Sequence, residues 1–329
     1  MSTPEREHRL EGLEPDNLLA FLALLGLLRA LEHARPAWRP RVRWSLDEPP
    51  LRPMLVLREP LEQADIAQAA AEGLDDLAKA HAFGRRDLNH SVSDARAALS
   101  AGRNAGGYAA ELASALMSDA AVKTAQGKPL DVVEATPMCL LFGQGHQHFL
   151  ERLGEVPREP APPSRGKGKK AVHLTPAECL AEALYQPWRR LDPTFSFRWD
   201  PEEAMRYALM SGDPSEAKNK DGTQHGANRL AAIGLSALPV APEQRGVQVR
   251  LGLPGGAWRR GFSFAWPIWR DPVGLQAIRG LLAHPDLREP AALDRLGVDH
   301  IRQVRRISVG KFMNFTAARS VDYAGIGTS

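Results

Sequence analysis

An apolar run from Leu18 to Leu28 is the feature that most restricts how this chain can fold. The run ends at Arg29 after eleven residues, whereas a helix that spans a bilayer needs about 20 apolar residues. Asp16 and Asn17 come directly before it and are good helix caps. The sequence around it also lacks the basic leader and the small-residue cleavage site of a signal peptide. We therefore predict a helix buried in the core of a cytoplasmic protein that has no membrane partner.

Composition indicates the class of protein to which this core belongs. The chain has 329 residues, of which 43% are hydrophobic and 25% are charged, as in globular proteins that bury a core. Its two cysteines, Cys139 and Cys179, form neither a disulfide framework nor a zinc-binding spacing. We expect both to be buried thiols in a reducing compartment.

Positive charge is concentrated in two segments of the chain. Residues 157–173 carry a net charge of +4 and residues 301–320 a net charge of +5, which leaves −6 for the rest of a chain whose total is +3. Such clustering favours local contacts with a polyanion over a surface that is basic throughout. The alternative is that some of these arginines only contribute to a solvated surface.

The clearest boundary in the sequence is a basic segment rich in proline and glycine. Residues 157–170 include four prolines and two glycines, a composition that cannot bury a face. We predict an N-terminal α+β lobe over residues 1–155, a flexible basic linker or loop over 156–175, and a C-terminal α+β lobe with a basic helical end over 176–329.

Periodicity and alanine content predict a mixed α+β fold, rich in helix, with short antiparallel strands. Residues 100–107 are expected to form a flexible glycine-containing loop. The predicted helices cover residues 18–32, 64–82, 94–99, 108–121, 149–153, 176–185, 202–209, 228–235, 273–282 and 291–306. The predicted strands cover residues 39–44, as an exposed edge, and 195–199, 246–251 and 261–266.

A glycine- and histidine-containing segment, residues 143–148, is the sharpest local signal. His146 and His148 point the same way on a strand and, with Cys139 upstream, can share a metal ion. A hydrolytic metal site also needs a carboxylate base, and no Asp or Glu lies between Ala135 and Leu150. Two alternatives remain open. The glycines let the backbone approach a phosphate or base, with Gln144, His146 and His148 as donors, or the segment is a structural turn.

A long polar segment, residues 211–229, offers side chains that hold phosphates or contact base edges. The alternative is a mobile surface loop. Its candidate nucleic-acid-binding residues are Lys218, Asn219, Lys220, Gln224, His225, Asn228 and Arg229.

Basic residues near the C-terminus form a second group of candidates. Arg259 and Arg260 follow Trp258, a combination suited to clamping phosphate and stacking on bases. Residues 291–306 resemble a helix-turn-helix with Gly297 in the turn, which makes a DNA-binding regulator an alternative function. Further phosphate-binding candidates are Arg302, Arg305, Arg306 and Lys311, together with the linker residues Lys167, Lys169 and Lys170.

Common catalytic signatures are missing from the sequence. The glycines of residues 100–107 lack the lysine and hydroxyl of a P-loop, and no GxSxG, HExxH or dinucleotide-binding fingerprint is present. We therefore expect a protein that binds a ligand without catalysing a reaction, and that needs no cofactor. A metal-dependent hydrolase that uses His146 and His148 is the less favoured alternative.

Several segments resemble large-subunit proteins of type I CRISPR effector complexes, of the subtype I-G. They are residues 10–29 (LEGLEPDNLLAFLALLGLLR), 142–147 (FGQGHQ), 197–201 (FRWDP), 206–208 (RYA) and 226–230 (GANRL). The resemblance implies a subunit that contacts the protospacer-adjacent motif of double-stranded target DNA, in a complex with guide RNA and other subunits. It also implies that cutting falls to a separate helicase-nuclease, since base pairing with the guide supplies most of the specificity.

Overall fold

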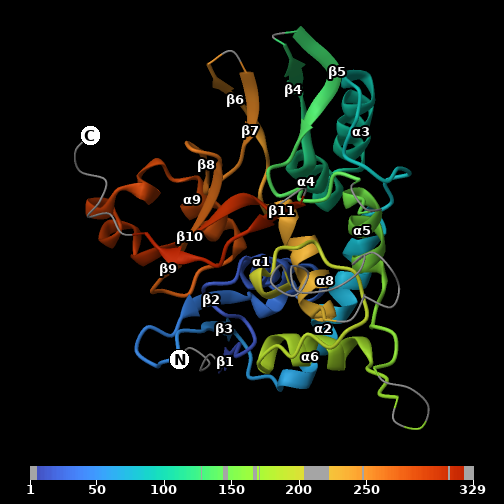
Figure 1. Ribbon diagram of the computed structural model, residues 1–329. Helices are drawn as coiled ribbons and strands as arrows, with labels where there is room; N and C mark the ends of the chain where they lie inside the picture. The colour runs from blue at the N-terminus through green and yellow to red at the C-terminus, as the bar shows by residue number, and fades with distance from the viewer. Residues whose placement is uncertain are drawn as a thin grey trace.

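The computed structural model describes residues 6–126, 128–143, 147–165, 169, 171–203, 222–246, 248–309 and 312–321 (Figure 1). Its mixed α+β architecture confirms the predicted fold class. The α-helices are α1 (Leu18–Ala34), α2 (Gln63–Leu77), α3 (Val92–Ala105), α4 (Gly107–Leu116), α5 (Phe149–Glu155), α6 (Pro176–Tyr185), α8 (His225–Gly234) and α9 (Leu275–Ala283). The strands are β1 (Arg6–Arg9), β2 (Arg41–Trp44), β3 (Pro53–Leu57), β4 (Met117–Ala125), β5 (Lys128–Ala135), β6 (Ala241–Arg245), β7 (Gln248–Gly252), β8 (Gly256–Trp258), β9 (Phe262–Trp269), β10 (Val298–Val309), β11 (Phe312–Phe315) and β12 (Arg319–Ser320).

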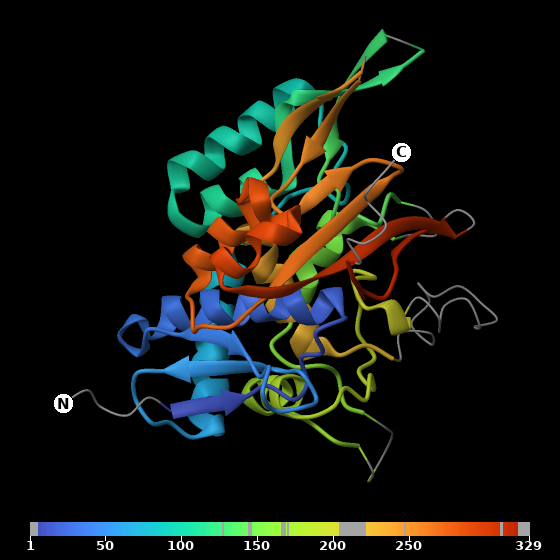
Figure 2. The same cartoon turned by 90° about the vertical axis from the view of Figure 1, so that its left-hand side faces the viewer.

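Helix α1 lies at the centre of the molecule, as its sequence predicts (Figure 2). The side chain of Asn17 caps it by accepting hydrogen bonds from the backbone N–H groups of Leu19 and Ala20, at 2.9 and 3.4 Å. Every residue from Leu18 to Leu28 is buried, and Phe21 stacks on Trp266 of β9 with ring centroids 5.2 Å apart. No helix in the described part of the chain is both long enough and apolar enough to cross a membrane.

Two glycines allow α1 and α8 to cross in close contact. A Cβ atom added at Gly26 would lie 1.8 Å from the carbonyl oxygen of Leu230, and one at Gly234 would lie 2.1 Å from that of Leu22. Any side chain at either position would therefore force the two backbones apart. This crossing joins a helix from the N-terminal half to one from the C-terminal half.

The strands form antiparallel sheets on either side of α1 (Figure 2). One sheet has the order β1-β3-β2, so the strand predicted over residues 39–44 forms as β2, but its outer edge is not exposed because Val42 also bridges Val273. The other has the order β11-β10-β9-β8, with β12 also paired to β10. The hairpins β4–β5 and β6–β7 project from the same side of the molecule in both views (Figures 1 and 2).

The two sheets meet through aromatic side chains. Trp44 of β2 packs edge-to-face on Trp269 of β9 at 5.9 Å, and the indole N–H of Trp269 donates to the carbonyl oxygen of Val42 at 2.6 Å. One hydrophobic core contains residues from both halves of the chain. The division into two lobes joined by a linker is therefore not confirmed.

The predicted helix over residues 291–306 is wrong. The chain there makes short 3-10 turns over Pro290–Ala292 and Asp294–Leu296, Gly297 adopts a φ of 66°, and β10 begins at Val298. Pairing with β9 outweighs the helix propensity of alanine, leucine and arginine in this stretch. Because Arg302, Arg305 and Arg306 lie on a strand, residues 291–306 do not form the helix-turn-helix on which the alternative of a DNA-binding regulator rested.

Other local predictions also need correction. The expected loop over residues 100–107 belongs to α3 and to the start of α4, with Gly106 between them, and the helix expected to reach residue 121 ends at Leu116 where β4 begins. Residues 195–199 form no strand, because Arg198 adopts a φ of 63°, which is incompatible with extended backbone. Of the helix expected over 202–209, residues 202 and 203 are helical and 204–209 lie outside the described residues.

The predicted linker is packed against the core at its first residues. Val156 and Pro157 are buried, and the ring Nε2 of His225 lies 2.7 Å from the carbonyl oxygen of Glu159. Farther along, the guanidinium of Arg165 pairs with Asp192 at 2.6 Å and with Glu182 at 2.8 Å. Val156, Pro157, Glu159 and Arg165 of this segment are thus held by specific contacts.

Candidate nucleic-acid interface

The C-terminal sheet carries exposed arginines that are available to a ligand. Arg259 and Arg260 follow β8, Arg305 lies on β10, and Arg319 lies on β12. All four are exposed, and their side chains make no hydrogen bond or ion pair with any residue that the structure describes. Exposed guanidinium groups without a carboxylate partner are suited to binding phosphate oxygens.

Arg305 and Arg319 lie on the same face of the sheet. Arg319 is directly opposite Gln303 in the β10–β12 register, and Arg305 is two residues farther along β10. Side chains two residues apart on a strand point to the same side. The other end of this face is covered by the apolar side chains of Leu287 and Leu293, which pack on Ile301.

Arg302 and Arg306 lie on the opposite face of β10, together with Val304, which is fully buried in the main core. The predicted helix would have grouped Arg302, Arg305 and Arg306 on one face, because a helix brings residues three and four apart together. The strand instead separates Arg305 from the other two. Arg302 and Arg306 are only partly exposed. The guanidinium Nη1 of Arg306 donates to the carbonyl oxygen of Pro137 at 3.1 Å.

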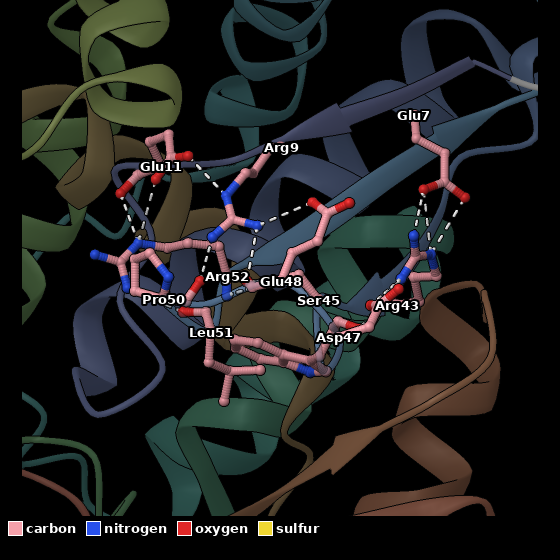
Figure 3. Close-up of polar contacts among 11 residues, drawn as sticks. Glu7, Arg9, Glu11, Arg43, Ser45, Asp47, Glu48, Pro50, Leu51 and Arg52 are labelled. Carbon is pink, nitrogen blue, oxygen red and sulfur yellow. Dashed lines mark hydrogen bonds and ion pairs between the residues drawn. The ribbon is translucent and has the colours of Figure 1, made fainter.

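In contrast to these exposed arginines, Arg9, Arg43 and Arg52 of the N-terminal sheet lie beside carboxylates (Figure 3). Arg9 pairs with Glu11 at 2.7 Å, and Arg43 pairs with Glu7 at 2.6 Å. Arg52 lies 3.8 Å from the same Glu11 carboxylate. A polyanion would have to compete with these carboxylates, so the N-terminal sheet is the poorer binding surface.

Four of the predicted binding residues prove to be buried at the start of α8. Gln224 is 3% exposed, and His225, Asn228 and Arg229 are not exposed at all. A Cβ atom at Gly226 would lie 2.6 Å from the carbonyl oxygen of Cys179, which shows how tightly this end of α8 packs on α6. The prediction that these four side chains contact nucleic acid is not compatible with this packing.

Arg229 instead fastens the chain segment that follows α5. Its guanidinium donates to the carbonyl oxygens of Pro157 at 3.2 Å and Pro160 at 2.8 Å, and to the carboxylate of Asp75 at 2.6 Å. Burial lowers the pKa of Arg229, and the hydrogen bond that Arg229 donates to Asp75 acts in the opposite direction. This side chain has a structural role that its sequence context did not indicate.

His148 is held by a carboxylate that lies far from it in the sequence. Its ring Nδ1 is 2.9 Å from both oxygens of Asp87, and Gly143 closes the turn before it by donating from its N–H to the carbonyl oxygen of Gln147 at 2.9 Å. Gly143 has a φ of 81°, a conformation that favours glycine. The partner carboxylate was missed because the sequence search covered only the neighbouring residues.

Cys139 does not join this pair. It is buried, its thiol contacts the carbonyl oxygen of Leu141 at 3.4 Å, and burial raises its pKa to about 12. Within the described residues no three His, Cys, Asp or Glu side chains are grouped as a metal site requires. His146, the second predicted ligand, lies outside that part of the chain.

The remaining candidates fall into two groups. Lys169 is exposed. The candidates that lie outside the described residues are Gln144, His146, Lys167, Lys170, Lys218, Asn219, Lys220 and Lys311.

No protein-family model matches this sequence, and no curated protein matches it. The functional argument therefore depends on the residues and geometry of this chain, and on the short motifs quoted above.

Proposed function

We propose that this protein is a non-enzymatic subunit of a type I CRISPR RNA-guided effector complex in the cytoplasm. In this role it contacts the protospacer-adjacent motif and the target DNA, and it helps to recruit a separate helicase-nuclease for antiviral defence. Its partners are the guide RNA, double-stranded target DNA and the other subunits of the complex. The motifs that resemble subtype I-G large subunits direct the proposal to this class.

One observation supports the nucleic-acid part of the proposal most strongly. Arg259, Arg260, Arg305 and Arg319 are exposed without a carboxylate partner among the described residues, whereas Arg9 and Arg43 of the N-terminal sheet are paired. Unpaired guanidinium groups on one sheet supply the phosphate contacts that position a protein on nucleic acid. The base contacts that recognise the motif are assigned to the segment with Lys218, Asn219 and Lys220, which stays a prediction.

Binding of the assembled effector complex to two duplexes tests the proposal. The complex should bind a duplex that carries the motif more tightly than one that lacks it. Arg305→Ala combined with Arg319→Ala should weaken binding to both duplexes about tenfold, because phosphate contacts carry no sequence information. Arg35→Ala combined with Arg96→Ala is the matched control, since these arginines pair with Glu72 and Asp119.

Replacing Lys218, Asn219 and Lys220 with alanine tests the recognition segment separately. The triple variant should lose the preference between the two duplexes. An unchanged preference would remove this segment from the proposal, and equal binding of both duplexes by the original complex would overturn motif recognition altogether.

The metal-dependent hydrolase is a separate candidate, favoured only by the contact between His148 and Asp87. Elemental analysis after purification with added zinc or manganese distinguishes the two proposals. A stoichiometric metal ion that is present in the unaltered protein and lost in His148→Ala would support the hydrolase. Absence of a metal ion from the unaltered protein would leave that candidate without support.

A further inference from the structure

A second cationic site lies on the core-facing side of the C-terminal sheet, where the two projecting hairpins meet β8 and β10. It is a pocket of about 160 Å³. Its lining residues come from β4, β5, β7, β8, β10 and the segment before Gly143, and they are Lys123, Glu134, Ala135, Phe142, Arg250, Leu251, Trp258 and Arg306.

Aromatic rings fix the cations of this pocket in place. The guanidinium carbon of Arg306 lies 5.2 Å from the centre of the Trp258 ring and 5.7 Å from that of Phe262. The guanidinium of Arg250 lies 5.6 Å from the same Trp258 ring. The indole N–H of Trp258 donates to the carbonyl oxygen of Leu251 at 2.7 Å, which holds the ring between strands. Cations held on aromatic faces lose little conformational freedom when they bind an anion.

Charge in the pocket is unbalanced. Lys123, Arg250 and Arg306 face a single lining carboxylate, Glu134, which pairs with Arg250 at 3.0 Å. Glu243 lies opposite Arg250 in the β6–β7 register, but its carboxylate pairs with Arg245 at 2.9 Å. Among the described residues, Arg306 has a carbonyl oxygen and two aromatic rings as partners and no carboxylate.

Phe142 adds an exposed ring at this pocket. Its side chain is 42% exposed, although large apolar side chains are usually buried. An exposed aromatic ring beside a cationic pocket provides a surface on which a base can stack while its phosphate is held.

We infer that this pocket binds one nucleotide of a single nucleic-acid strand, with its phosphate held by Arg306, Arg250 and Lys123 and its base against Phe142. The inference rests on the proposed function and extends it, because it adds a subsite for an unpaired nucleotide to the phosphate contacts of the outer sheet face. The carboxylate of Glu134 competes with the phosphate for Arg250. Removing the negative charge of Glu134 therefore strengthens binding of the nucleotide.

Binding of a short single-stranded RNA to the full chain at low salt tests the inference. Glu134→Gln should tighten binding about threefold, because it frees Arg250 and removes the one negative charge that lines the pocket. Arg306→Gln should weaken it about tenfold, the effect of losing one charge-assisted contact. Glu72→Gln, which breaks the exposed pair with Arg35 at 2.6 Å, is the matched control and should change nothing.

Photocrosslinking shows which part of the protein lies against the bound RNA. RNA that carries 4-thiouridine should crosslink to the peptide that contains Phe142 or Trp258, and Arg306→Gln should reduce this crosslink. If RNA binds and the Arg305→Ala, Arg319→Ala variant weakens it, but Glu134→Gln and Arg306→Gln have no effect, the pocket is refuted and the proposed function survives. If the unaltered chain binds no RNA at all, the pocket is refuted, and the proposed function is decided by the binding of the assembled complex to the two duplexes.

Discussion

The guanidinium of Arg229 donates to the carboxylate of Asp75 at 2.6 Å, across 154 residues of sequence. Arg229 is fully buried, whereas Asp75 keeps 49% of its side chain exposed. The same guanidinium also holds the carbonyl oxygens of Pro157 and Pro160. One arginine on α8 thus joins α2 to the segment that sequence reasoning treats as a free linker.

Arg229→Ala is expected to lower the free energy of unfolding by about 2–4 kcal/mol, because it leaves buried carbonyl oxygens without a donor and creates a cavity. Urea denaturation measures the loss. Trypsin cleavage after Arg158 should also become faster, since this residue lies between the two carbonyl groups that Arg229 holds. The exposed Arg103 provides the control, and Arg103→Ala should leave both measurements unchanged. Equal stability of the two variants would contradict a structural role for Arg229.

His81 makes the stability of the fold depend on pH. Its ring Nδ1 lies 2.7 Å from the carbonyl oxygen of Leu153, and its Nε2 lies 2.7 Å from the hydroxyl of Tyr108. Burial lowers the pKa of His81 from 6.5 to about 4, so the ring stays neutral in the folded protein. The unfolded chain takes up the proton first as the pH falls. Stability is therefore fully present above about pH 6.5 and is lost progressively towards pH 4.

Between pH 6.5 and pH 4, protonation of His81 in the unfolded chain should lower the free energy of unfolding by about 3 kcal/mol, at about 1.4 kcal/mol per unit of pKa. His81→Gln should remove this part of the loss. The measurement is urea denaturation at several pH values between 7.5 and 4. Burial also lowers the pKa of His225 to about 4, so part of the loss should persist in the variant. His173→Gln alters an exposed histidine and serves as the control. Identical pH profiles for His81→Gln and the original protein would refute the assignment.

Segments whose fold is determined locally were the predictable ones. The apolar run after Asn17 predicted α1, and the alternation before Trp44 predicted β2. The helix expected over residues 176–185 is confirmed as α6, where Thr175 and Glu178 form a capping box around Pro176. In each case the residues that decide the structure lie within a few positions of one another.

Strands that depend on distant partners were not predictable from local composition. Residues 117–121 are helix formers by composition, but β4 pairs with β5. Val298–Val309 pairs with β9, about thirty residues earlier in the chain, and this pairing places Arg305 and Arg306 on opposite faces. The residues of the candidate site were also not predictable from local sequence. Arginine was the expected type of residue, but which arginines are exposed, paired or buried follows from tertiary contacts such as that between Arg229 and Asp75.

The salt dependence of RNA binding tests the central claim most directly. The full chain is titrated with a single-stranded RNA of about 20 nucleotides, and log Kd is plotted against log salt. Each phosphate contact contributes about 0.7 to the slope for a single strand, so Arg305→Ala combined with Arg319→Ala should reduce the slope by about 1.4. Arg35→Ala combined with Arg96→Ala should leave it unchanged. Equal slopes for all three proteins would contradict the claim that the exposed arginines of the C-terminal sheet bind nucleic acid.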